Sequence, residues 1–258
     1  MKHTGFLFLC LFFYGQLYSQ NIQIKYAGDP LPDKDRKKIE QFLNYEIEFY
    51  AKFGLPDTLS LRLTVFEQRE KGFAYLDSIG VHPTMRPNGM YIVNRKEAIL
   101  LGRENGRERS LAIIYHELSH NLTEQIIGKR PPAWLMEGLA EYFEHCEMGK
   151  KGLKHGLTPY EKGRIRTMYM LGEIDIETFV DSDKSKFMKK QRTEEQYAYI
   201  LAHALVAFWI EKVPEDILAN FISSLQNTED KAPVSVKIGR VYPGSIRQFE
   251  QDFAAFCK

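Results

Sequence analysis

The sequence predicts an α+β fold in which a small mixed sheet with helices comes first and a mainly helical half follows. Short runs of alternating apolar and polar residues occur before residue 107, and helical periodicity dominates after it. The composition is that of a globular protein, with 44% hydrophobic and 27% charged residues among 258. We therefore expect one domain, 20–258, built from a mixed subdomain, 20–106, and a mainly helical subdomain, 107–258.

The first subdomain is expected to alternate strands with helices. The segment 21–26 alternates in polarity, and from Asp33 to Gly54 the apolar side chains recur on one helical face. Further strands are expected where polarity alternates again or where short extended runs occur, and a short helix is expected between them. In order, these elements are a strand at 59–66, a helix near 71–79, and extended runs at 89–93 and 97–101.

The second subdomain is expected to be almost wholly helical. Apolar residues recur at three- and four-residue spacing through most of it. The charge-rich stretch 181–192 interrupts this pattern and is typical of a solvated loop. The expected helices lie near 107–127, 132–147, 158–171, 192–212, 214–226 and 244–256.

The first residues are typical of a signal peptide. Lys2 and His3 precede an apolar run from Phe6 to Tyr14, and small or polar residues follow at Ser19 and Gln20. This run is far shorter than the ~20 residues of a membrane span. We therefore expect residues 1–19 to be removed and the protein to be exported to the periplasm or the extracellular space, without a membrane span after cleavage.

Charge and cysteine content limit the partners and the covalent links. Thirty-five Lys and Arg oppose 34 Asp and Glu, so the net charge of +1 disfavours a nucleic-acid partner. After signal removal two cysteines remain, Cys146 and Cys257. In an exported protein they can form one disulfide or stay as two buried thiols, and both alternatives remain open.

The segment 113–120, IIYHELSH, carries the clearest chemical signal. His116 and His120 lie four residues apart, so on a helix both imidazoles project from one face and can reach the same zinc ion at ~2.0–2.1 Å. The opposite side of this helix is apolar, which would anchor it in the core. The anchoring residues are Leu111, Ile114, Leu118 and Leu122.

A second helix can supply a third ligand. Gly128 is a natural helix end and Pro131 with Pro132 a natural helix start, which predicts a short antiparallel hairpin. Glu137 and His120 then differ in depth by only about 4–5 Å along the helix axes. Two histidines with Glu137 leave the fourth position of one zinc ion open for water, as in catalytic sites. Glu141 shares the face of Glu137 and can accept a hydrogen bond from a ligating histidine.

Together, HELSH and WLMEGLAEYFE resemble the gluzincin branch of zinc peptidases, the peptidase MA-like superfamily that includes thermolysin and aminopeptidases with HExxH and WLxEGxA segments. The resemblance is close over 113–144. It implies a zincin-like fold with one zinc ion per chain. It also implies that His116, His120 and Glu137 hold the zinc, that Glu117 is the general base, and that Glu141 orients a ligating histidine.

The sequence departs from the aminopeptidases of this branch. Those enzymes carry a GxMEN-like segment that anchors the substrate's amino terminus, whereas Asn88 to Ile92 reads NGMYI and lacks the acid. This difference argues against an aminopeptidase. The run from Glu97 to Leu101 is instead expected to resemble the edge strand along which an extended substrate lies.

The resemblance implies an exported zinc peptidase that hydrolyses peptide bonds of a peptide or protein substrate. A zinc-bound water would attack the carbonyl group while Glu117 accepts its proton. The main alternative is a catalytically inactive zinc-binding or scaffold protein of the same fold, and an intact Glu117 favours activity. A secreted binding module in which the motif is accidental is the second alternative.

A further donor is expected to stabilise the oxyanion. In the resembling families this is often a tyrosine on a later helix, followed by small and apolar residues. Tyr199 has this context, with Ala202, Leu205 and Val206 after it. Tyr197 and His203 are competitors, and Tyr199 can equally be a core residue. His82, His145 and His155 lack a partner pattern and are expected to be surface or packing residues.

Overall fold

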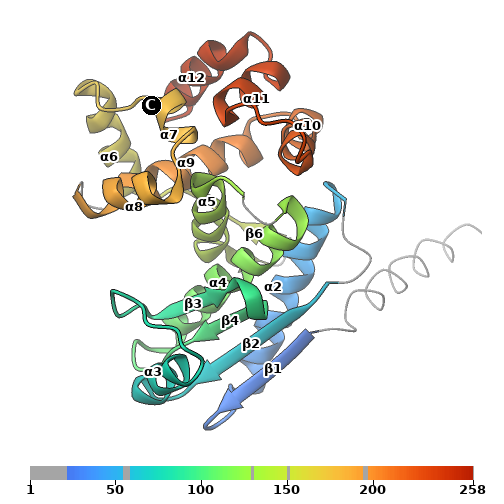
Figure 1. The fold of residues 1–258 in the computed structure, drawn as a ribbon, viewed down its shortest axis with the longest axis vertical. Helices are drawn as coiled ribbons and strands as arrows, with labels where there is room; N and C mark the ends of the chain where they lie inside the picture. Colours follow the sequence, from blue (N-terminus) through green and yellow to red (C-terminus); the bar gives the residue numbers. More distant parts are fainter. Residues whose placement is uncertain (1–21, 55–58, 129–130, 150–151, 194–196, 258) are drawn as a thin grey trace, which may run out of the picture. The chain divides into compact units, whose positions relative to one another are not determined.

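The computed structural model describes residues 22–54, 59–128, 131–149, 152–193 and 197–257 (Figure 1). The predicted signal peptide, 1–19, lies outside them. The fold is α+β, as predicted, with a small mixed sheet near the N-terminus and mostly helices after it. The chain forms two compact units that divide between Leu122 and Thr123, within one helix. They are called unit 1 and unit 2.

Unit 1 contains a four-stranded sheet with the order β1-β2-β4-β3. The first three strands in this order are parallel, and β3 pairs with β4 in the antiparallel direction. The strands are β1 (Ile22–Ala27), β2 (Leu61–Phe66), β3 (Gly89–Ile92) and β4 (Glu97–Leu100).

The expectation for the run from Glu97 to Leu101 is wrong. Its strand, β4, lies inside the sheet between β2 and β3, and all four of its residues are buried. Among the described strands, β3 forms the edge on that side, so an extended peptide added to this edge would pair with the NGMYI segment.

The helices of unit 1 are α2 (Asp33–Ala51), α3 (Arg69–Ser78), the short 3-10 helix η2 (Val93–Arg95) and most of α4 (Arg107–Ile127). α2 buries an apolar face that includes Ile39, Phe42 and Tyr50. α3 covers a separate cluster made with the sheet, in which Leu76 contacts the side chains around Phe66 and Ile99.

Among its described residues, unit 2 consists of helices and one pair of short antiparallel strands that the sequence did not predict. Its core helix is α9 (Tyr197–Glu211), which is buried at every residue from Ile200 to Trp209 and packs against α5, α6, α8, α10 and α12. The other elements are α5 (Ala133–Glu144), β5 (Glu147–Gly149), β6 (Gly152–Lys154), α6 (Pro159–Met170), α7 (Ile176–Val180), α8 (Lys184–Thr193), α10 (Glu215–Gln226), α11 (Val234–Val241) and α12 (Ser245–Phe256).

The stretch 181–192 is not the loop that its charge suggested. Most of it is α8, and the helix is held by Phe187, which is 1% exposed and contacts Phe179 and Tyr199. A single apolar anchor gives no periodicity, so the surrounding lysines dominated the pattern. Asp181 is also engaged, because its carboxylate accepts hydrogen bonds from the backbone and hydroxyl of Ser235.

The structure decides between the two alternatives for the cysteines. Cys146 and Cys257 are buried thiols that are not joined by a disulfide. Among the described helices, none combines the length and apolar character needed to cross a membrane.

Candidate functional site

The histidines of the HELSH motif lie one turn apart on α4, within unit 1. Their ring centroids are 4.7 Å apart and the rings are nearly perpendicular. The ligand atoms of His116 and His120 lie within 4.8 Å of each other, so small side-chain rotations suffice to place both on one ion. The apolar residues on the other side of α4 are at most 5% exposed: Leu111, Ile114, Leu118 and Leu122.

Contacts inside unit 1 fix the position of α4. Tyr115 stacks on Phe42 of α2, with ring centroids 4.0 Å apart. The Asn121 amide donates to the backbone carbonyl of Lys96, in the turn before β4, at 3.0 Å. Each contact removes freedom from the helix that carries the motif, as a precise ligand geometry requires.

A buried carboxyl also lies beneath the motif. Glu46 of α2 is fully buried beside Ser119 of α4. Burial raises the pKa of Glu46 well above its usual range, because water no longer solvates the carboxylate. Glu46 therefore stays neutral up to a higher pH than an exposed glutamate does.

The side chain of Glu117 lies against the backbone of the edge strand β3. A Cβ placed on Gly89 would be 2.7 Å from Glu117 Oε1 and 2.5 Å from Ile113 Cγ2. Only glycine leaves room for the carboxylate at this point. The next side chain on this face, Tyr91, lies with its ring centroid 6.4 Å from that of His120. The sheet edge thus runs past both the acid and the second histidine.

The predicted carboxylates lie on α5, in unit 2. Glu137 and Glu141 are both partly buried and are one turn apart. His116 and His120 in unit 1 and Glu137 in unit 2 each carry a side chain that can ligate a metal ion. Two imidazoles and one carboxylate are the donor set of many catalytic zinc sites, so the chemistry of the residues fits zinc. Because Glu137 belongs to a different unit from the histidines, their meeting on one ion is part of the proposal below.

The three candidates for the oxyanion donor differ in their burial and in their hydrogen-bond partners. The Tyr197 hydroxyl donates to the backbone carbonyl of Glu173 at 3.2 Å, and the ring is 1% exposed. His203 is fully buried, and both of its ring nitrogens have partners. Tyr199 is partly exposed and packs edge-on against Phe187. Its role in stabilising the oxyanion stays a prediction.

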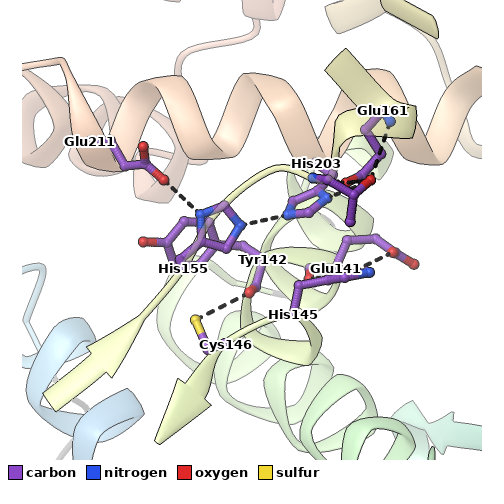
Figure 2. Close-up of polar contacts among 9 residues, drawn as sticks. Glu141, Tyr142, His145, Cys146, His155, Glu161, His203 and Glu211 are labelled. Carbon is purple, nitrogen blue, oxygen red and sulfur yellow. Dashed lines mark hydrogen bonds and ion pairs between the residues drawn. The ribbon is translucent and has the colours of Figure 1, made fainter. Parts of the chain in front are cut away.

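Unit 2 also contains a polar cluster that the sequence did not predict (Figure 2). Glu141, His145 and His203 form another set able to hold a metal ion. His155 is in contact with His203, and its side chain is only 3% exposed, so of the two alternatives for this residue, surface or packing, it is a packed histidine. His145, His155 and His203 lie ten or more residues apart in the sequence, so no local motif brings them together.

The ionisation of this cluster follows from burial and pairing. Burial and the neighbouring imidazoles of His203 and His145 lower the pKa of His155 to about 3. Burial alone would raise the pKa of Glu161, but hydrogen bonds from His203 and Thr158 lower it to about 2. Glu161 is therefore a carboxylate at neutral pH.

Comparison with known proteins gives one match, to a family model that covers part of the chain. The family described as "Protein of unknown function (DUF1570)" matches residues 110–235. The matched segment contains the HELSH motif and all of α5 and α9, and it begins after the four-stranded sheet. Curated proteins gave no match.

Proposed function

We propose that this protein is an exported zinc-dependent peptidase whose active site is built on α4. The observation that carries the proposal is the arrangement inside unit 1. His116 and His120 lie together one turn apart, and Glu117 lies against the edge strand β3. Metal ligands, an acid and a free strand edge are the parts that metal-assisted peptide hydrolysis requires.

His116, His120 and Glu137 hold the zinc ion in this proposal. When bound, zinc supplies Lewis-acid chemistry, which acidifies water and polarises a carbonyl group. Glu141 accepts a hydrogen bond from a ligating histidine and so fixes the tautomer and orientation of its ring.

The remaining steps belong to the chain's own residues. An extended peptide pairs with the open edge of β3, which places its carbonyl group near Glu117. Glu117 accepts a proton from the attacking water and passes it to the leaving amine. The Tyr199 hydroxyl donates a hydrogen bond to the oxygen on which negative charge develops.

Digestion of a diverse peptide mixture tests this function. The protein comprising residues 20–258 is incubated with the mixture as purified, after metal removal by a chelator, and after zinc is restored. We expect new peptide termini in the first and third samples and none in the second. A zinc-loaded, folded protein that produces no new termini would instead support the inactive scaffold.

A further inference from the structure

Two histidines of unit 2 with buried side chains face each other through their Nε2 atoms. His155 Nε2 and His203 Nε2 are 2.7 Å apart (Figure 2). Each Nδ1 lies 2.6 Å from a carboxylate oxygen, His155 from Glu211 and His203 from Glu161. Where both acids are ionised they only accept, so each Nδ1 carries hydrogen and two neutral rings then oppose two Nε2 lone pairs. A shared proton or a metal ion removes that repulsion.

The same carboxylates give the arrangement found around ligating histidines. In metal sites, a histidine that binds through one nitrogen donates its other N–H to a carboxylate or a backbone carbonyl. His155 and His203 both have this partner. The Glu161 carboxylate is itself held, because its second oxygen accepts hydrogen bonds from the backbone and hydroxyl of Thr158, at the start of α6.

A third histidine is oriented in the same way. His145 Nδ1 is 2.8 Å from the backbone carbonyl of Glu141, so its Nε2 keeps the lone pair. The His145 ring is stacked on that of His203, with centroids 4.8 Å apart. Glu141, His145 and His203 offer ligand atoms within 4.8 Å of one another.

The three histidines come from elements that unit 2 holds together. His145 follows α5, His155 follows β6, and His203 lies in the buried part of α9. The hairpin β5–β6 connects the first two, and Tyr142 of α5 stacks on His155 with ring centroids 3.9 Å apart. α5 and α9 pack directly on each other. An ion bound here would tie the hairpin to both helices.

We propose that His203, His145 and Glu141, with His155 at 2.7 Å from His203, form a second metal site, which binds a divalent transition-metal ion such as zinc and stabilises unit 2. Imidazole is the donor that such ions prefer, and burial makes the site structural rather than catalytic. At metal–nitrogen distances of ~2.0–2.1 Å, tetrahedral ligands are roughly 3.3 Å apart. The rings of His155 and His203 therefore separate slightly when the ion replaces the shared proton. This site does not depend on the peptidase proposal.

Cobalt binding to a variant without the motif histidines tests the second site. The double variant H116A/H120A is stripped of metal and titrated with Co²⁺, while visible absorption and bound cobalt are measured. We expect about one bound cobalt per chain with visible d–d bands, and a melting temperature that rises with cobalt. Adding His155→Gln should abolish all three signals.

Two further variants keep the outcome decisive. His82→Gln is the control, because this side chain is 71% exposed and lies outside the cluster; it should leave cobalt binding unchanged. If the His155→Gln protein does not fold, Glu211→Gln removes only the carboxylate behind His155 and should weaken cobalt binding by about 10- to 100-fold. A folded H116A/H120A protein that binds no cobalt overturns the second site and leaves the peptidase proposal intact.

Discussion

Replacing Gly138 by alanine should destabilise unit 2, because α5 and α9 approach each other closely at this residue. A Cβ on Gly138 would lie 2.7 Å from Val206 Cγ2 and closer still to the backbone carbonyl oxygen of Ala202. The Val206 methyl group can shift, but the Ala202 carbonyl belongs to the buried part of α9 and cannot. The two helices must therefore move apart.

The expected magnitude follows from two opposing terms. Overpacking of a core costs about 1–3 kcal/mol, whereas alanine in place of glycine inside a helix gains about 0.5–1 kcal/mol. We expect a net loss of about 1–2 kcal/mol. For a protein of this size that corresponds to a melting temperature lower by roughly 2–8 °C.

The melting temperature of Gly138→Ala, measured by circular dichroism during heating, tests this prediction. The matched control is Gly163→Ala in α6, where a Cβ would meet no atom within 4 Å. The control should melt at or slightly above the wild-type temperature, since only the helix-propensity gain remains. If both variants melted at the same temperature, the close approach of α5 and α9 would be refuted.

Three other predictions concern the proposed catalytic residues and their support. Gly89→Ala should displace the Glu117 carboxylate and lower kcat by about 10- to 100-fold with unchanged metal content; wild-type kcat would contradict the contact. Tyr199→Phe should lower kcat by about 100-fold with unchanged KM and melting temperature, and an unaltered kcat would end that assignment. Because the folded-state pKa of Glu46 is raised, its contribution to stability is present below the unfolded pKa of ~4.3 and is lost as pH rises through the folded pKa. The melting temperature of Glu46→Gln relative to wild type should therefore increase between pH 4 and pH 7; a constant difference would show that Glu46 does not titrate in this way.

The sequence predicted the parts of the fold that depend on local pattern. α4 begins and ends as predicted, at Arg107 and Ile127, because its apolar stripe is regular and Gly128, which has a φ of 114°, ends it. The spacing of His116 and His120 also follows from the pitch of one helix. The α+β class followed from the change in periodicity near residue 107.

Nonlocal features could not be predicted in this way. Which of β3 and β4 forms the sheet edge depends on strand order, and two short apolar runs contain no information about it. The cluster around His203 brings together residues from α5, a hairpin, α6 and α9. The sequence related His203 only to Tyr199 and Glu141 only to the zinc helix, and it gave no sign that His145 and His155 lie beside them.

The most direct test of the peptidase proposal compares wild type with Glu117→Gln on one peptide that the wild type cleaves. Glutamine has nearly the shape of glutamate but cannot accept the proton, so metal content and melting temperature should stay unchanged. We predict that kcat falls by about 100- to 10,000-fold, since proton transfer alone contributes on the order of 10²–10⁴. A Glu117→Gln protein that hydrolyses the peptide at the wild-type rate would contradict the central claim.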